Sequence, residues 1–129
     1  MTNYPNDQGN PAGAIPVYVV SGTGGGGYTP AAASVVVVTT GGTAVTALSG
    51  PANGAMILNP PTANGQGIAS VEAMYVSVVD TPGSTEAAGN GSTVPLLPGG
   101  TFIVPPIAAG VSVKVNAPTS GHKFTAFRW

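Results

Sequence analysis

The acidic side chains are the first candidates for chemistry, because the chain of 129 residues has no cysteine and four acids. Glu72, Asp80 and Glu86 lie in the body of the chain. A glycosidase needs two carboxylates that face each other across a cleft. Glu72 and Asp80 are separated along one predicted strand by roughly 26 Å, which is too far for joint action. We therefore expect each acid to pair with a basic side chain at the surface.

The other candidates for chemistry are the single histidine and a glycine-rich stretch. His122 cannot form a zinc site without cysteine or well-placed carboxylates, so we expect an ordinary residue at the start of a strand. Ser21–Gly27 (SGTGGGG) lacks the Lys-Ser/Thr of a Walker motif and precedes no expected helix, which favours a flexible linker. The chain also has no Gly-x-Ser-x-Gly motif. The sequence thus predicts no catalytic residue, no metal ligand and no cofactor, and an enzyme is not expected.

The charge and the hydropathy of the chain argue against some classes of partner. Three basic and four acidic residues give a net charge of −1, which argues against nucleic-acid binding, since that needs several cations facing phosphates. A nearly uncharged surface favours a chain that ends up inside an assembly. The first residues, MTNYPNDQGNP, lack the basic and apolar regions of a signal peptide, and no apolar run reaches membrane-spanning length. We expect no membrane partner, and a protein made in the cytoplasm.

The elements that must position these residues are short strands. Thr101–Val104 is a strand candidate bounded by Pro98-Gly99-Gly100 and by Pro105-Pro106. Farther on, Val111–Asn116 alternates valine with polar residues, which is typical of a half-buried strand. The same pattern of Val/Thr runs between Gly, Pro and Asn turns predicts further strands at Ile15–Val20, Ser34–Thr40, Thr43–Leu48, Ala55–Asn59, Ile68–Asp80, Thr93–Leu97 and His122–Trp129.

Two of these predictions concern how the strands are connected and covered. Ser34–Thr40 is a continuous run of mostly β-branched residues, which predicts a strand covered on both faces and joined through Gly41-Gly42 in a hairpin to Thr43–Leu48. Ile68–Asp80 is the longest stretch without a break. A helix over its first half is possible, but the valine content favours a strand. Thr81–Ser92 is expected to be an exposed loop.

The expected fold is all-β: an antiparallel sandwich of eight or nine strands, jelly-roll-like, over residues 28–129. Residues 1–27 form a separate N-terminal arm in this prediction. The arm contains a polar start, an edge strand at Ile15–Val20 with Pro16 near its beginning, and the Ser21–Gly27 linker.

Bulky side chains gather in the last strand. Lys123, Thr125, Phe127 and Trp129 share one face of an extended strand, whereas Phe124, Ala126 and Arg128 share the other. Both faces therefore carry aromatic rings. Either this is a central strand packed on both sides, or one face meets a neighbouring subunit, where Phe, Trp and Arg are common anchors.

The two ends of the chain resemble a known family. GNPAGAIPVYVVSGTGGGG at Gly9–Gly27, and LLPGGTFIVPP with the downstream VSVKV and GHKFTAFRW, are similar to small virion proteins of tailed bacteriophages. These include decoration or cement proteins of the head, and some head-fibre and tail-accessory proteins. The resemblance implies a β-sandwich or jelly-roll body, often trimeric, with a terminal arm on the capsid lattice and no catalytic residues. The central Ala31–Ala88 carries no resemblance.

The sequence and the resemblance together predict a non-enzymatic capsid decoration protein on the surface of a virion. Its expected partners are the major capsid protein and further copies of itself, as a homotrimer. The expected interface residues are Ile15, Pro16, Val17, Tyr18, Val19, Val20, Phe124, Phe127, Arg128 and Trp129. The alternative is a tail or fibre module that recognises a host glycan, with Tyr28, Tyr75 and the Asn90 loop at its site. A secreted adhesin is a weaker third hypothesis, because no export signal is found.

Overall fold

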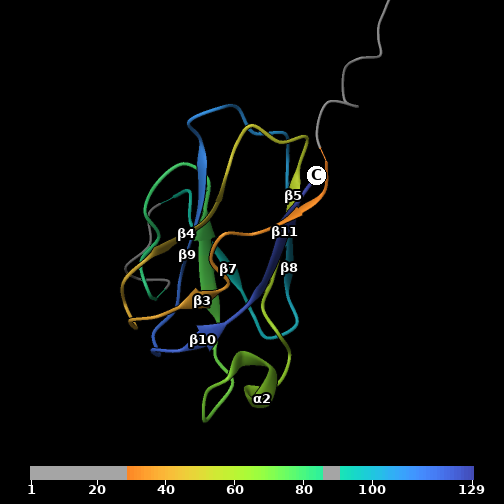
Figure 1. Cartoon of the computed structure of the whole chain (residues 1–129). Coiled ribbons are helices and arrows are strands. Elements are labelled where there is room, and N and C mark those ends of the chain that lie inside the picture. Colours follow the sequence, from red (N-terminus) through yellow and green to blue (C-terminus); the bar gives the residue numbers. More distant parts are fainter. Residues whose placement is uncertain (1–28, 86–90) are drawn as a thin grey trace, which may run out of the picture.

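The structure is a computed structural model, and it describes residues 29–85 and 91–129. Antiparallel strands form two four-stranded sheets that pack together (Figure 1). The predicted antiparallel β-sandwich is therefore confirmed. The predicted arm at residues 1–27, with Ile15–Val20 and Ser21–Gly27, lies outside the described residues, as do Tyr28, Glu86 and Asn90.

Each large sheet combines strands that are far apart in the sequence. The first, here named the β5 sheet, has the order β2 (Ala31–Ala32), β11 (Thr125–Arg128), β5 (Ala55–Leu58) and β8 (Thr101–Val104). The second, named the β9 sheet, has the order β4 (Val45–Ser49), β9 (Ser112–Asn116), β6 (Met74–Ser77) and β7 (Val94–Leu96). A small third sheet pairs β10 (His122–Lys123) with β3 (Val37–Val38).

The order of the strands follows a regular scheme. We count β2 with β3 as the first strand and β10 with β11 as the eighth. The β5 sheet then has the order 1-8-3-6 and the β9 sheet the order 2-7-4-5. Successive strands therefore pass from one sheet to the other, except for β6 and β7, which are neighbours within the β9 sheet.

The core lies between the two sheets and is built from alternate residues. Val113 and Val115 of β9 are fully buried, which confirms the alternation predicted for that strand. The β5 sheet contributes the buried side chains of Ala55, Ile57, Val104 and Ala126 to the same cluster. Most core residues are valine and alanine, with Phe124 as the large aromatic member.

Several predicted strands are found where the sequence placed them. Thr101–Val104 has the predicted bounds. The strands predicted at Thr43–Leu48, Ala55–Asn59, Thr93–Leu97 and Val111–Asn116 correspond to β4, β5, β7 and β9 with small shifts at their ends. Turn residues flank each of them, so the turn signals located them well.

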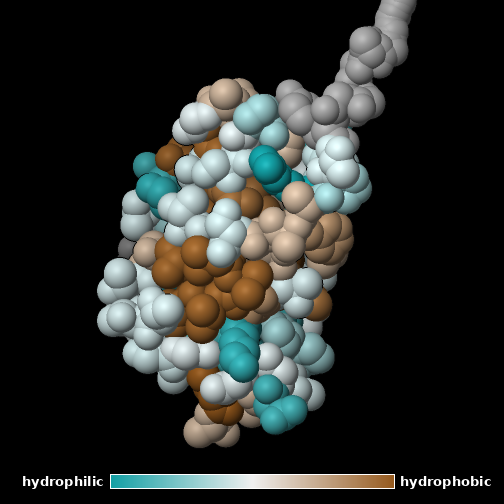
Figure 2. Space-filling view, viewed as in Figure 1, coloured by the Kyte–Doolittle hydropathy of each residue, from teal (hydrophilic) through white to brown (hydrophobic). Residues whose placement is uncertain are grey.

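The prediction for Ser34–Thr40 was wrong. Only Val37–Val38 forms a strand, which pairs with β10 and not with β4. Val36 is 43% exposed, so the run is not covered on both faces. The hydrophobic surface in the middle of Figure 2 lies where Figure 1 draws this segment. Gly41, at the expected turn, lies against Pro118 instead, where an added Cβ would come within 2.1 Å of the carbonyl oxygen.

The prediction for Ile68–Asp80 was too long. Only Met74–Ser77 is a strand, and a one-turn helix, α2 (Ala63–Gln66), precedes it. Thr62 caps this helix by accepting a hydrogen bond from the Gly65 amide at 3.0 Å. Gly67 ends it with a positive φ of 73°, a conformation that glycine adopts readily.

The C-terminal strand is divided in two. His122–Lys123 pairs with β3, whereas Thr125–Arg128 lies between β2 and β5. Phe124 links them, and its amide donates to the carbonyl of Val36 at 3.0 Å. The alternation of faces is as predicted: Phe124 and Ala126 point into the core, and Phe127 is exposed on the other side.

Candidate functional site

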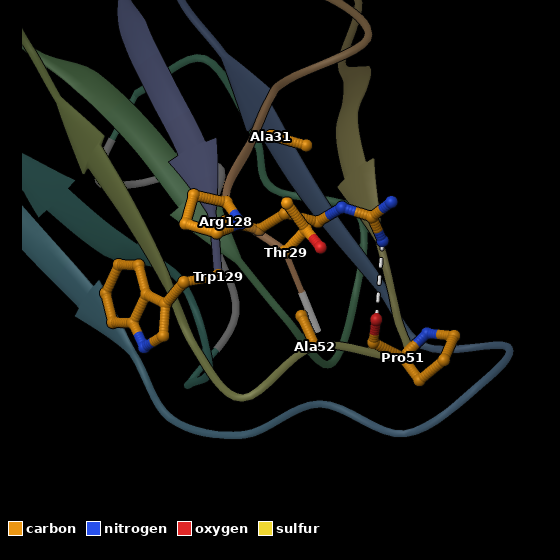
Figure 3. A pocket seen from close by; sticks show the side chains of 7 residues that line it. Thr29, Ala31, Pro51, Ala52, Arg128 and Trp129 are labelled. Atoms are coloured by element: carbon orange, nitrogen blue, oxygen red, sulfur yellow. Dashed lines mark hydrogen bonds between the residues drawn. The ribbon is translucent and has the colours of Figure 1, made fainter. Parts of the chain in front are cut away.

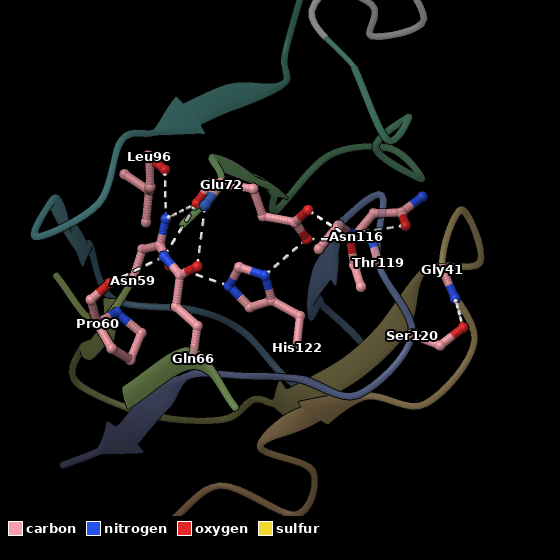
Figure 4. A network of polar contacts seen from close by, with 11 residues as sticks. Gly41, Asn59, Pro60, Gln66, Glu72, Leu96, Asn116, Thr119, Ser120 and His122 are labelled. Atoms are coloured by element: carbon pink, nitrogen blue, oxygen red, sulfur yellow. Dashed lines mark hydrogen bonds and ion pairs between the residues drawn. The ribbon is translucent and has the colours of Figure 1, made fainter. Parts of the chain in front are cut away.

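A buried histidine lies at the end of the sandwich near α2 (Figures 1 and 4). His122 is 0% exposed. Its Nδ1 lies 2.9 Å from Oε1 of Glu72, and its Nε2 lies 3.0 Å from Oδ1 of Asn59. The expected surface pairing of Glu72 with a lysine or arginine is wrong, because the partner of this carboxylate is the histidine ring. His122 was expected to be an ordinary residue at the start of a strand, but it joins distant parts of the chain.

Two side-chain amides fix the direction of every hydrogen bond around the ring. Asn59 Nδ2 donates to the carbonyls of Glu72 at 3.0 Å and Leu96 at 2.8 Å. Gln66 Nε2 donates to Asn59 Oδ1 at 2.8 Å, while Gln66 Oε1 accepts from the Glu72 amide at 3.0 Å. Turning either amide around would oppose donors to donors, so the orientation follows from the network.

Both nitrogens of His122 therefore face oxygen acceptors. Nε2 satisfies its contact by donating to Asn59 Oδ1, and Nδ1 lies at hydrogen-bond distance from the Glu72 carboxylate. The same carboxylate accepts from the Thr119 amide at 3.0 Å and from the Thr119 hydroxyl at 2.6 Å. Both ring nitrogens contact protein groups and the ring is fully buried, so this cluster joins distant parts of the chain at the end of the sandwich.

Within residues 29–85 and 91–129, no three histidine or acidic side chains gather in a way that could hold a metal ion. In the same part of the chain, no helix has the length and apolar character needed to cross a membrane.

The outer face of the β5 sheet carries an apolar row that crosses all four strands. The register places Ala32 beside Phe127, Phe127 beside Met56, and Met56 beside Ile103. Ala55, Ile57, Val104 and Ala126, which are neighbours of these residues along the strands, are buried in the core, so the row points outward. Phe127 is 37% exposed and Ile103 is 59% exposed. We name Ala32, Phe127, Met56 and Ile103 the outer row.

The surroundings of the outer row are uncharged as well. The next row along the strands consists of Thr125, Leu58 and Thr101. At the other end, Trp129 lies with its ring centroid 6.0 Å from that of Phe127. The indole lies over Gly54, where an added Cβ would come within 2.7 Å of it. A contiguous apolar surface of this kind commonly marks an interaction site.

The predicted interface residues separate into different environments. Phe127 and Trp129 belong to the outer face of the β5 sheet. Phe124 is 4% exposed and packs in the core of the chain itself. Arg128 donates from Nη1 to the carbonyls of Ser49 at 3.0 Å and Pro51 at 3.3 Å. The remaining predicted contacts, Ile15–Val20, lie outside the described residues.

A shallow pocket of about 310 Å³ opens beside the C-terminus (Figure 3). Trp129, Arg128 and Pro51 line it, together with Thr29 and Ala31 at the point where the described chain begins. Tyr75 was predicted to contribute to a glycan site, but it is 8% exposed and cannot stack on a sugar. The half-buried ring of Trp129, which lines this pocket, is the aromatic side chain placed for such a role.

Sequence reasoning missed Ile103, Met56, Asn59 and Gln66. One signal was present for Ile103: TFIV has apolar residues on both faces of a strand, so one face had to point away from the core. Nothing in the spacing of Asn59, Gln66, Glu72 and His122 indicates a cluster. Only the folded chain brings them together.

Comparison of the chain with protein-family models, with curated proteins and with solved structures gives no match.

Proposed function

We propose that this chain is a non-enzymatic structural protein of a virus particle, which decorates and stabilises the assembled capsid. It binds as an oligomer, and the N-terminal arm at residues 1–27 reaches the major capsid protein and neighbouring copies. The outer face of the β5 sheet carries the proposal, because an apolar and uncharged sheet face is suited to burial in an assembly.

The order of the strands gives independent support. Eight strands in the orders 1-8-3-6 and 2-7-4-5 are what we expect of a jelly roll, so we propose this form of the sandwich. Jelly rolls recur in viral capsid proteins and in lectins. A fold of this kind is compatible with many functions, so it adds to the argument from the surface and to the resemblance of the two ends.

The first test measures how many copies of the chain a virus particle contains. Quantitative mass spectrometry of purified particles of the virus that encodes the chain measures its copy number against the major capsid protein. A ratio comparable to the capsid protein is expected for a decoration protein. A few copies per particle would assign it to the tail or to a vertex, and its absence from the particle would overturn the proposal.

The second test adds purified full-length chain to capsids that lack it. Binding is expected for the natural chain and for the variant V79K, because Val79 is 72% exposed on a loop that follows β6 of the other sheet. A chain with three charges in the arm, V17D/V19D/I15D, is expected to lose binding. If this variant binds as tightly as the natural chain, the arm does not make the contact.

A glycan-binding module of a tail or fibre is the second candidate. The pocket beside Trp129 favours it, because an aromatic ring next to an arginine suits a sugar with a negatively charged group. Binding on a glycan array that is lost in W129A, together with few copies per particle, would favour this candidate over capsid decoration.

A further inference from the structure

The outer row ends at an open edge of the sheet. β8 is the last strand of the β5 sheet, and within the described part of the chain no strand pairs with its far side. Half of the backbone N–H and C=O groups of such an edge strand point away from its one neighbour and can pair with an added strand. Ile103, which is 59% exposed, is the member of the outer row that lies on this edge.

The chain contains a segment that fits this edge. Ile15–Val20 (IPVYVV) is apolar on both faces of an extended strand, with Ile15, Val17 and Val19 on one and Pro16, Tyr18 and Val20 on the other. An added strand with these residues would extend the outer row on one side and the apolar core layer on the other. Pro16 lacks an N–H, which an edge strand tolerates near its start.

The position of β2 indicates whether a segment that pairs with β8 comes from the same chain or from a second copy. Thr29 precedes β2, which lies at the opposite edge from β8. To reach its own β8, the segment would have to cross the sheet, over a distance of about 14 Å. The spacer Ser21–Tyr28 is long enough, with a reach of about 28 Å, but it would then lay glycines over the outer row and bury little apolar surface.

We infer that the β8 edge and the outer row receive the Ile15–Val20 segment of a second copy of this chain, so that copies are joined by exchanged strands. Main-chain hydrogen bonds to β8 supply the affinity, and the apolar side chains on both faces supply the register. No charged side chain is buried in this arrangement, because the outer row and its neighbours carry none. The inference concerns self-association and holds whether or not the assembly sits on a capsid.

Engineered cysteines test the pairing directly, because the full chain contains none of its own. We expect I103C combined with V17C or with V19C to give covalent dimers and larger species on mild oxidation, seen on a non-reducing gel. The matched control combines V17C with V79C, because Val79 is more exposed than Ile103 but lies on a loop. Disulfides formed within single chains would overturn the inference, as would equal cross-linking in the control.

Sedimentation of the full chain provides the second measurement. The natural chain and V79K are expected to be oligomers, and I103K is expected to be a monomer with an unchanged circular dichroism spectrum. A monomeric natural chain, or an I103K variant that stays oligomeric, would overturn the inference. If I103K becomes monomeric but neither arm cysteine cross-links to I103C, then a sheet face of the second copy is the occupant and the arm is not.

Discussion

The outer faces of the two sheets are covered in different ways. On the β9 sheet, Asn116 is 3% exposed although it points away from the core. Its side-chain amide donates to the carbonyl of Pro82 at 2.9 Å and to that of Gly42 at 3.2 Å. Ser77 is 1% exposed, and its hydroxyl accepts from the amides of Val79 and Asp80. The chain thus covers this face with its own loop.

On the β5 sheet the equivalent positions hold the outer row, which remains exposed in the single chain. The difference teaches how to distinguish two kinds of surface. Polar side chains that point outward but are buried mark a face that the chain covers itself, because their hydrogen bonds go to its own loops. Apolar side chains that point outward and stay exposed mark a face that another segment or molecule covers.

The largest loss of stability is expected from changes to the buried polar cluster around His122 at the end of the sandwich. Asn59→Ala removes both donors and the acceptor that face Leu96, Glu72, Gln66 and His122. We expect it to lower the free energy of unfolding by about 3–5 kcal/mol, because a buried ring and two carbonyls lose their partner. Urea unfolding measures this loss.

A nitrogen-15 NMR measurement of the natural chain sharpens that prediction. Nε2 of His122 is expected to carry a proton in the folded protein, because it faces the Oδ1 acceptor of Asn59. A bare Nε2 would mean that the Asn59 amide is turned around, so that its NH2 group donates to the ring.

A smaller loss of stability is expected from a change on the outer face of the β9 sheet, which the chain covers with its own loop. Asn116→Ala frees the carbonyls of Pro82 and Gly42, so we expect a loss of about 2–3 kcal/mol in the free energy of unfolding. Lys114→Ala on the same strand is the control, with a change within about 0.5 kcal/mol. Equal effects in the two variants would contradict the view that the amide holds the loop.

Ser77→Ala is expected to cost about 1–2 kcal/mol, because the amides of Val79 and Asp80 lose their acceptor while the loop can still turn toward water. Hydrogen exchange provides the check. The two amides should exchange faster in the variant, and amides in the β5 sheet should not change beyond the global difference.

The smallest effect on the single chain is expected on the exposed face. Ile103→Thr should change the free energy of unfolding of the monomer by less than about 0.5 kcal/mol, because the side chain is 59% exposed. Urea unfolding at low protein concentration measures the monomer alone. A loss of several kcal/mol there would mean that a segment of the same chain already covers Ile103.

Much of the sandwich could be predicted from local patterns, and the reasons for the failures are physical. Thr101–Val104 was located correctly because prolines and glycines bound it on both sides. The prediction for Ser34–Thr40 was wrong because its β-branched residues indicate only a preference for extended backbone. The packing of Gly41 on Pro118 depends on a distant segment of the chain. The histidine network could not be predicted, since Asn59 and His122 are joined only in the folded chain. Phe127 on an exposed face was one of two alternatives that the sequence left open.

The position of β11 has a consequence for synthesis. Thr125–Arg128 lies in the interior of the β5 sheet, with β2 on one side and β5 on the other. A ribosome must therefore release the chain through Arg128 before the sheet can close, however early β2 and β5 emerge. Pairing over so long a separation makes folding slow. A chain broken off before Thr125 leaves a gap between β2 and β5, so an incomplete product lacks Phe127, the aromatic member of the outer row.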